Sequence, residues 1–134
     1  MADSSVGVSW AVKGQSSSAT DELRERVLSV DAFVVPALWM LEVANALLVL
    51  MRRRKIEPED HADARFWLSR LKPLIDEEAS LLAFGRITEL AGEHSLTVYD
   101  AIYLELALRR SLPLASRDAS LNKAARRCGV QTLL

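Results

Sequence analysis

The chain has 134 residues, half of them hydrophobic and 26% charged, which predicts one globular domain over residues 1–134 with a substantial core. Its 17 basic and 18 acidic side chains give a net charge of −1, so no overall basicity indicates a nucleic-acid-binding protein. The single cysteine, Cys128, excludes an internal disulfide framework, and the longest apolar run, 41–51, is too short to cross a membrane; we therefore expect a cytoplasmic protein without membrane contact.

Helical segments and short apolar segments alternate along the first half of the chain. Residues 21–30 have helical character, and 32–35 are a β-type run that ends at a proline. Residues 39–54 form the longest predicted helix. It is apolar nearly all round, which favours burial against several neighbours and, with the nearby Trp67, predicts a homodimer. A further helix begins at Pro58, and 74–75 is a short stretch of predicted strand.

The second half continues the alternation. Residues 78–93 predict a helix with four inward-facing residues, Leu81, Phe84, Ile87 and Leu90. Residues 112–116 and 130–134 are strand-like, and 118–128 predict the short helix between them. This pattern predicts an α/β fold with a mostly parallel central sheet that is covered on both faces. In such folds, ligands bind at the carboxyl ends of the strands.

The stretch 96–107 places one acid at the start of an otherwise apolar helix. Thr97, followed three residues later by Asp100, is typical of a capping box, so the helix should begin there. The apolar stripe expected to face the core consists of Tyr99, Ile102, Tyr103, Leu106 and Ala107. Asp100 alone could be a carboxylate that only interacts with the helix N-terminus.

Four acids are expected at one edge of the sheet: Asp3, Glu42, Asp100 and Asp118. Three of them lie at or near a predicted junction between a strand and a helix. Carboxylates that converge repel one another unless cations neutralise them, so the cluster predicts a metal site. Oxygen ligands without paired histidines or cysteines favour Mg²⁺ or Mn²⁺, which can activate water for phosphodiester hydrolysis.

Each acid also has a structural alternative. Glu42 lies among apolar residues and could form a structural ion pair. In the metal-site interpretation, Asn45, one turn later, could hydrogen-bond Glu42 and fix its side-chain rotamer. Asp118 could cap the last helix, and Asp3 could be a solvated terminal residue.

Other polar residues give weaker signals. His61 and His94 stand alone on segments that we expect at the surface. The basic run 52–55 is typical of a solvated helix end, with contact to RNA phosphate as the alternative, and the same choice applies to Arg109 and Arg110. Cys128 is expected to be a small core residue.

Three stretches of the chain carry a recognisable order of motifs. They are 36–47, with Glu42 and Asn45; 96–101, with Asp100; and 113–130, with Ser116 and Asp118. Together they resemble the PIN domain and, more narrowly, the VapC toxins of type II toxin–antitoxin pairs, in register from about Asp3 to Leu134.

The resemblance implies a three-layer α/β/α sandwich and a Mg²⁺- or Mn²⁺-dependent endoribonuclease. It also implies a homodimer that is inhibited by a cognate VapB-type antitoxin. The family's acidic quartet would fall on Asp3, Glu42, Asp100 and Asp118, and its supporting polar positions on Asn45, Ser116 and Ser5.

In that family the first acid ends a hydrophobic strand in the middle of the sheet. Here only Met1 and Ala2 precede Asp3, so we expect a truncated first strand. This leaves an alternative function open, a catalytically impaired PIN-fold module that pairs with an antitoxin or with itself. A phosphotransfer hydrolase with an aspartyl nucleophile is a weaker alternative, because Asp3 is the only acid after that strand.

Overall fold

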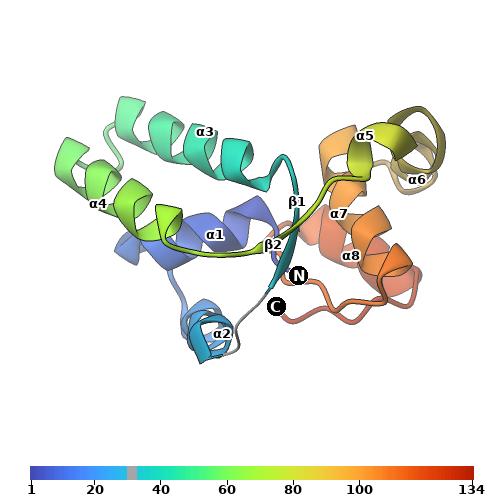
Figure 1. Cartoon of the computed structure of the whole chain (residues 1–134), viewed down its shortest axis with the longest axis horizontal. Helices are drawn as coiled ribbons and strands as arrows, with labels where there is room; N and C mark the ends of the chain where they lie inside the picture. Colours follow the sequence, from blue (N-terminus) through green and yellow to red (C-terminus); the bar gives the residue numbers. More distant parts are fainter. Residues whose placement is uncertain (30–32) are drawn as a thin grey trace.

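The structure is a computed structural model that describes residues 1–29 and 33–134. It is mostly helical, and its described strands pair in parallel (Figure 1), which confirms the predicted α/β class. The elements are α1 (Ser4–Ala11), η1 (Lys13–Gln15), α2 (Ser18–Ser29), β1 (Val34–Pro36), α3 (Trp39–Arg52), α4 (Pro58–Ser69), β2 (Leu74–Asp76), α5 (Ala79–Leu82), η2 (Ala83–Ile87), α6 (Thr88–His94), α7 (Val98–Arg109) and α8 (Ala119–Arg127). The ends of the predicted helix and strand that fall on 30–32 lie outside the described residues.

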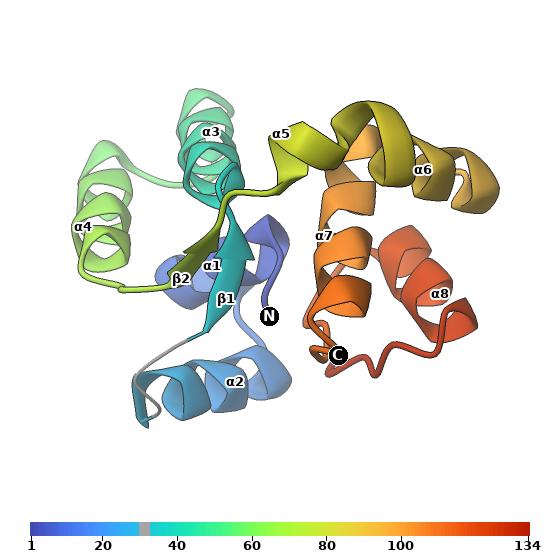
Figure 2. The ribbon, with the colours of Figure 1, turned by 45° about the vertical axis from the view of Figure 1, so that its right-hand side comes forward.

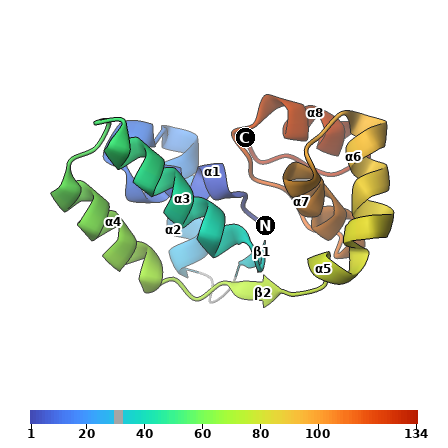
Figure 3. The same cartoon turned by 90° about the horizontal axis from the view of Figure 1, so that it is seen from above.

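Two groups of helices enclose the strands. Seen from above, α1, α3 and α4 lie on one side of the β1–β2 pair, and α5 to α8 lie on the other (Figure 3). The strands therefore form the middle layer, as the predicted sandwich requires. Within the described part of the chain, no helix combines the length and the apolar character needed to span a bilayer.

The sheet is small and parallel. Val34 pairs with Leu74 and Pro36 with Asp76, and isolated parallel bridges join Ala2 to Ala115 and Leu114 to Thr132. The segments 112–116 and 130–134 thus form isolated bridges and not the regular strands that we predicted. The N-terminus lies beside β1 (Figures 1 and 2), but no backbone hydrogen bond joins 1–3 to β1 among the described residues. Residues 1–3 pair instead with the segment around Ala115.

Helix α1 was not predicted as an element. Asp3 caps it, because its side chain accepts a hydrogen bond from the backbone N–H of Val6 at 3.1 Å. Val6, Val8 and Trp10 are all buried, and so are the residues between them. A short helix that is buried nearly all round has no apolar stripe, so helical periodicity could not reveal it.

The predicted helix over 78–93 is broken. A π-helical turn, η2, separates α5 from α6, and Gly85 within it has non-helical backbone angles of φ −120° and ψ −111°. The extra residue in this turn shifts the helical phase. Leu81 and Phe84, which we expected to face inward, are exposed as a result, whereas Ile87 and Leu90 are buried as predicted.

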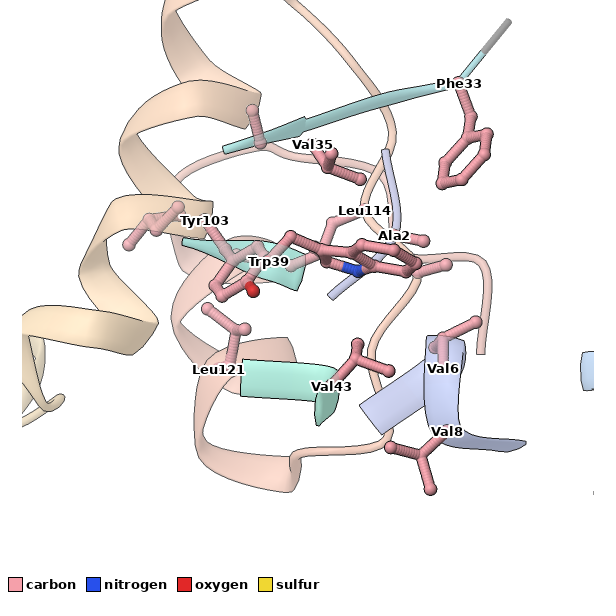
Figure 4. Close-up of a cluster of buried hydrophobic side chains, with 14 of the residues drawn as sticks. Ala2, Val6, Val8, Phe33, Val35, Trp39, Val43, Tyr103, Leu114 and Leu121 are labelled. Atoms are coloured by element: carbon pink, nitrogen blue, oxygen red, sulfur yellow. The ribbon is translucent and has the colours of Figure 1, made fainter. Parts of the chain in front are cut away.

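The core joins both helical layers through the strands. Figure 4 shows its centre, where Trp39 of α3 and Tyr103 of α7 lie among aliphatic side chains from β1, α1 and the C-terminal region. Phe33 packs edge-on against Trp39, with ring centroids 5.9 Å apart. Tyr99, which we placed in the buried stripe of its helix, is instead 64% exposed.

We expect Gly7→Ala to destabilise the protein. A Cβ at position 7 would lie 2.5 Å from Cζ2 of Trp39 and 3.1 Å from Cγ2 of Val43, and the Trp39 ring is fully buried. Overpacking of this kind lowers the free energy of unfolding by about 1–3 kcal/mol. This exceeds the roughly 1 kcal/mol that alanine normally gains over glycine in a helix.

Guanidinium denaturation measures this effect. Gly92→Ala is the matched control, because it is also helical and a Cβ there meets nothing within 4 Å; it should leave stability unchanged or slightly raised. A Gly7→Ala protein as stable as the Gly92→Ala control would contradict the steric argument.

Candidate functional site

Asp3 is a buried carboxylate held by hydroxyl groups. It is 4% exposed; Oδ1 accepts hydrogen bonds from Ser5 Oγ at 2.6 Å and from the Val6 N–H, and Oδ2 accepts one from Ser116 Oγ at 2.5 Å. Burial raises the pKa of Asp3, although these hydrogen bonds oppose the shift. The alternative of a solvated terminal residue is therefore wrong.

Glu42 lies in the first turn of α3 and is half-buried. Its Oε2 accepts a hydrogen bond from the phenol O–H of Tyr103 on α7. Burial raises the pKa of Glu42; the Tyr103 hydrogen bond opposes this, and the negative charges of Asp100 and Asp3 add to it. The negative charges of Asp100 on α7 and of Asp3, the N-cap of α1, thus act on Glu42 of α3.

Asp100 lies in the first turn of α7, where Thr97 fixes it. Thr97 Oγ1 accepts a hydrogen bond from the Asp100 N–H at 3.0 Å and donates one to Asp100 Oδ2 at 2.6 Å. Thr97 is the N-cap, as the sequence predicted. The carboxylate bonds the cap's hydroxyl rather than its backbone N–H. Within the described residues its other oxygen, Oδ1, accepts no hydrogen bond.

Asp118 caps α8, and Ser116 connects it to Asp3. Asp118 Oδ1 accepts a hydrogen bond from the Leu121 N–H at 2.7 Å, and its own N–H donates to Ser116 Oγ at 2.9 Å. The same Ser116 hydroxyl donates to Asp3. The capping role that we gave as an alternative is therefore confirmed, and Oδ2 of Asp118 accepts no hydrogen bond from the residues that the structure describes.

The expected hydrogen bond between Asn45 and Glu42 is not formed among the described residues, and Tyr103 donates to Glu42 instead. Asn45 is exposed on α3 and makes no hydrogen bond to Glu42 within the described residues; Tyr103 provides that bond. Sequence reasoning had assigned Tyr103 only to the apolar stripe. A buried tyrosine hydroxyl normally finds a polar partner, and this was the signal available in the sequence.

The four acids Asp3, Glu42, Asp100 and Asp118 offer the oxygen ligands that Mg²⁺ or Mn²⁺ prefers. Carboxylate oxygens are hard ligands, and a divalent cation would offset the repulsion that Asp100 and Asp3 exert on Glu42. Across residues 1–29 and 33–134, however, no three His, Cys, Asp or Glu side chains converge into a ready metal-binding group. Magnesium commonly binds through one or two carboxylates and keeps several waters, so the side chains fit an ion held by a pair of acids.

The comparison with known families decides the assignment. The profile of the PIN domain matches residues 1–127, nearly the whole chain. The chain belongs to the PIN domain family. Members of this family are in general nucleases that typically use divalent metals, and the assignment indicates RNA as the substrate class. A search of curated proteins finds no match to this PIN domain.

The weaker candidates lie outside this group of acids. Arg109 is held by carboxylates, with Nε 2.9 Å from Glu105 and Nη2 2.8 Å from Asp76, and Arg110 also contacts Asp76 at 2.8 Å. Both arginines thus have a structural role in ion pairs, and this was neither of the two alternatives, a solvated helix end or a contact with RNA phosphate, that we considered from the sequence.

The two histidines differ from their predicted surface positions. His61 is buried, and His94 is half-buried with Nε2 at 3.2 Å from the Sγ of Cys128. Cys128 is half-buried and packs against the core, as expected of a small core residue.

Proposed function

We propose that this PIN domain is a metal-dependent endoribonuclease of the VapC toxin type, which hydrolyses RNA phosphodiester bonds. The observation that carries the proposal is a pair of long-range hydrogen bonds that link the acids: Tyr103, three residues after Asp100 on α7, donates to Glu42 on α3. Ser116 donates to Asp3 and accepts from the backbone N–H of Asp118. Asp3, Glu42 and Asp100 each lie at the N-terminal end of a helix, α1, α3 and α7, which is typical of acids at the edge of a parallel sheet.

In this proposal Glu42 and Asp100 would hold the principal Mg²⁺ or Mn²⁺, Asp3 would be a further ligand, and Asp118 would contribute to a second, weaker site. The bound ion supplies Lewis-acid chemistry, since it polarises the phosphate and lowers the pKa of water. Thr97 orients Asp100, while Ser116 and Ser5 orient Asp3. Asn45, exposed on α3, is left as a candidate contact for substrate. No covalent intermediate with the protein is needed.

We further propose that the protein forms a homodimer and pairs with a VapB-type antitoxin in the cytoplasm. An apolar cavity of about 160 Å³ between α3 and α4 supports a protein partner; it is lined by Trp39, Met40, Val43, Ala44, Leu47, Arg65, Leu68 and Ser69. Leu41 on α3 and Phe66 on α4 are largely exposed. Apolar side chains that cluster on a surface are typical of an interface.

Metal titration followed by thermal denaturation tests the proposal. Ligands that bind only the folded state raise the melting temperature as their concentration rises, so we expect a Mn²⁺-dependent increase at millimolar metal. Glu42→Gln keeps the size of the side chain but removes its charge, and it should abolish the increase.

Asp63→Asn is the control, because Asp63 is an exposed acid on α4, and it should respond to Mn²⁺ like the wild type. A wild-type protein without any Mn²⁺ response would favour the alternative, a catalytically impaired binding module.

A further inference from the structure

Tyr103 makes the contact that joins the two helices of the proposed site. It lies three residues after Asp100 on α7, is 2% exposed, and donates its phenol hydrogen to Oε2 of Glu42 on α3. Helix α7 therefore carries one acid of the site, Asp100, and also the hydrogen-bond donor for another. The aromatic ring of Tyr103 packs in the core (Figure 4), so the position of the hydroxyl is set by the fold.

The kind of donor matters for what Glu42 can bind. A buried carboxylate needs a partner, and the usual partner is an arginine or lysine, whose positive charge would compensate the carboxylate. A phenol donates a single hydrogen bond and adds no charge. The Tyr103 hydroxyl thus occupies Oε2 and restricts rotation of the carboxylate without neutralising its charge, and among the described residues Oε1 of Glu42 has no hydrogen-bond partner.

The acids of the proposed site differ from Asp76, which forms ion pairs with basic residues. Asp76, the last residue of β2, is compensated by Arg109 and Arg110. No arginine or lysine forms an ion pair with Glu42, Asp100 or Asp3 within the described residues; the contacts that hold these acids come from hydroxyl and backbone N–H groups. The proposed site therefore combines uncharged hydrogen-bond donors with carboxylates whose negative charge no basic residue in the described part of the chain neutralises.

We propose that Tyr103 is a positioning residue that orients Glu42 for a divalent metal ion without neutralising it. This inference rests on the proposed metal-dependent function and adds a residue to it. Groups that hydrogen-bond to metal ligands fix ligand orientation, and removing them typically weakens metal binding by about 10–100-fold.

Mn²⁺ binding to the full chain, measured by the loss of the free Mn²⁺ signal in electron paramagnetic resonance, tests the proposal without an RNA substrate. We expect Tyr103→Phe, which removes only the hydroxyl, to raise the Kd for Mn²⁺ about tenfold or more. Tyr99→Phe is the matched control, because it makes the same change at an exposed tyrosine on the same helix, and its Kd should equal that of the wild type. A rise of less than about fivefold for Tyr103→Phe would overturn the inference.

A double variant separates positioning from a general structural effect. If Tyr103 acts through Glu42, then Glu42→Gln with Tyr103→Phe should bind Mn²⁺ no more weakly than Glu42→Gln alone. Losses that multiply would overturn the positioning role. If Glu42→Gln itself leaves the Kd unchanged, the proposed function fails; if Glu42→Gln weakens binding while Tyr103→Phe does not, only this inference fails.

Discussion

Asp100→Asn should abolish most of the Mn²⁺-dependent cleavage of single-stranded RNA. The change preserves the size of the side chain and its ability to accept a hydrogen bond from Thr97, but it removes the negative charge. Removing groups that only support a metal ligand lowers activity by about 10–100-fold, so loss of a ligand should lower kcat/KM by at least about a hundredfold. A fluorescent single-stranded RNA reporter with Mn²⁺ measures this rate.

The control for this experiment is Asp63→Asn, which makes the same chemical change on the exposed face of α4 and should cleave RNA at the wild-type rate. Circular dichroism checks that Asp100→Asn is folded, since the Thr97 hydroxyl still caps α7 through the backbone N–H of residue 100. Cleavage that is unchanged in Asp100→Asn would exclude Asp100 from the metal site and contradict the proposed mechanism.

Asp76→Asn should cause the largest loss of stability. Asp76 ends β2, is 2% exposed, and accepts two hydrogen bonds from Arg109, at 2.8 and 3.2 Å, and a contact from Arg110 at 2.8 Å. It thereby joins the sheet to the last turn of α7. Breaking a buried ion pair by removing one partner typically lowers the free energy of unfolding by about 3–5 kcal/mol. Because both arginines are partly exposed, we expect a value near the lower end, about 3 kcal/mol.

The same ion pairs predict how stability depends on pH. Burial acts to raise the pKa of Asp76, but the hydrogen bond from Arg109, the Glu78 N–H and the charges of Arg109 and Arg110 outweigh it and hold the pKa below its usual range. A carboxyl whose pKa is lower in the folded state stabilises the fold above its unfolded pKa, which is about 3.9. This contribution is lost as the pH falls below about 4, through the folded pKa.

Urea denaturation at pH 7 and at pH 3 measures both effects. The difference in stability between Asp76→Asn and the wild type should be largest at pH 7 and should shrink at pH 3, where the Asp76 carboxyl of the unfolded wild-type chain takes up a proton. Asp63→Asn should change stability by less than about 0.5 kcal/mol, as surface substitutions usually do. A constant difference at both pH values would mean that Asp76 stabilises the protein through packing and not through its charge.

Local signals in the sequence predicted much of the helical fold. The polar caps Thr97 and Asp118 correctly marked the starts of α7 and α8, and the proline at position 58 marked α4. These signals are reliable because each involves atoms within one turn of the chain. Where the local pattern was ambiguous, prediction failed: α1 has no apolar stripe, and the π-helical turn at Gly85 reversed the expected burial of Phe84.

The site shows the same division. The sequence by itself determined which segments carry acids and that several of these acids lie at the starts of helices. It also determined that the acids offer oxygen ligands and have no paired histidines or cysteines beside them. Only the tertiary structure decided which groups hold them: the Tyr103 bond to Glu42 spans 61 positions, and the Ser116 bond to Asp3 spans 113. Such contacts depend on how α3 and α7 pack against the sheet. Hydrophobic burial drives that packing, and it carries no sequence signal specific to one pair of residues.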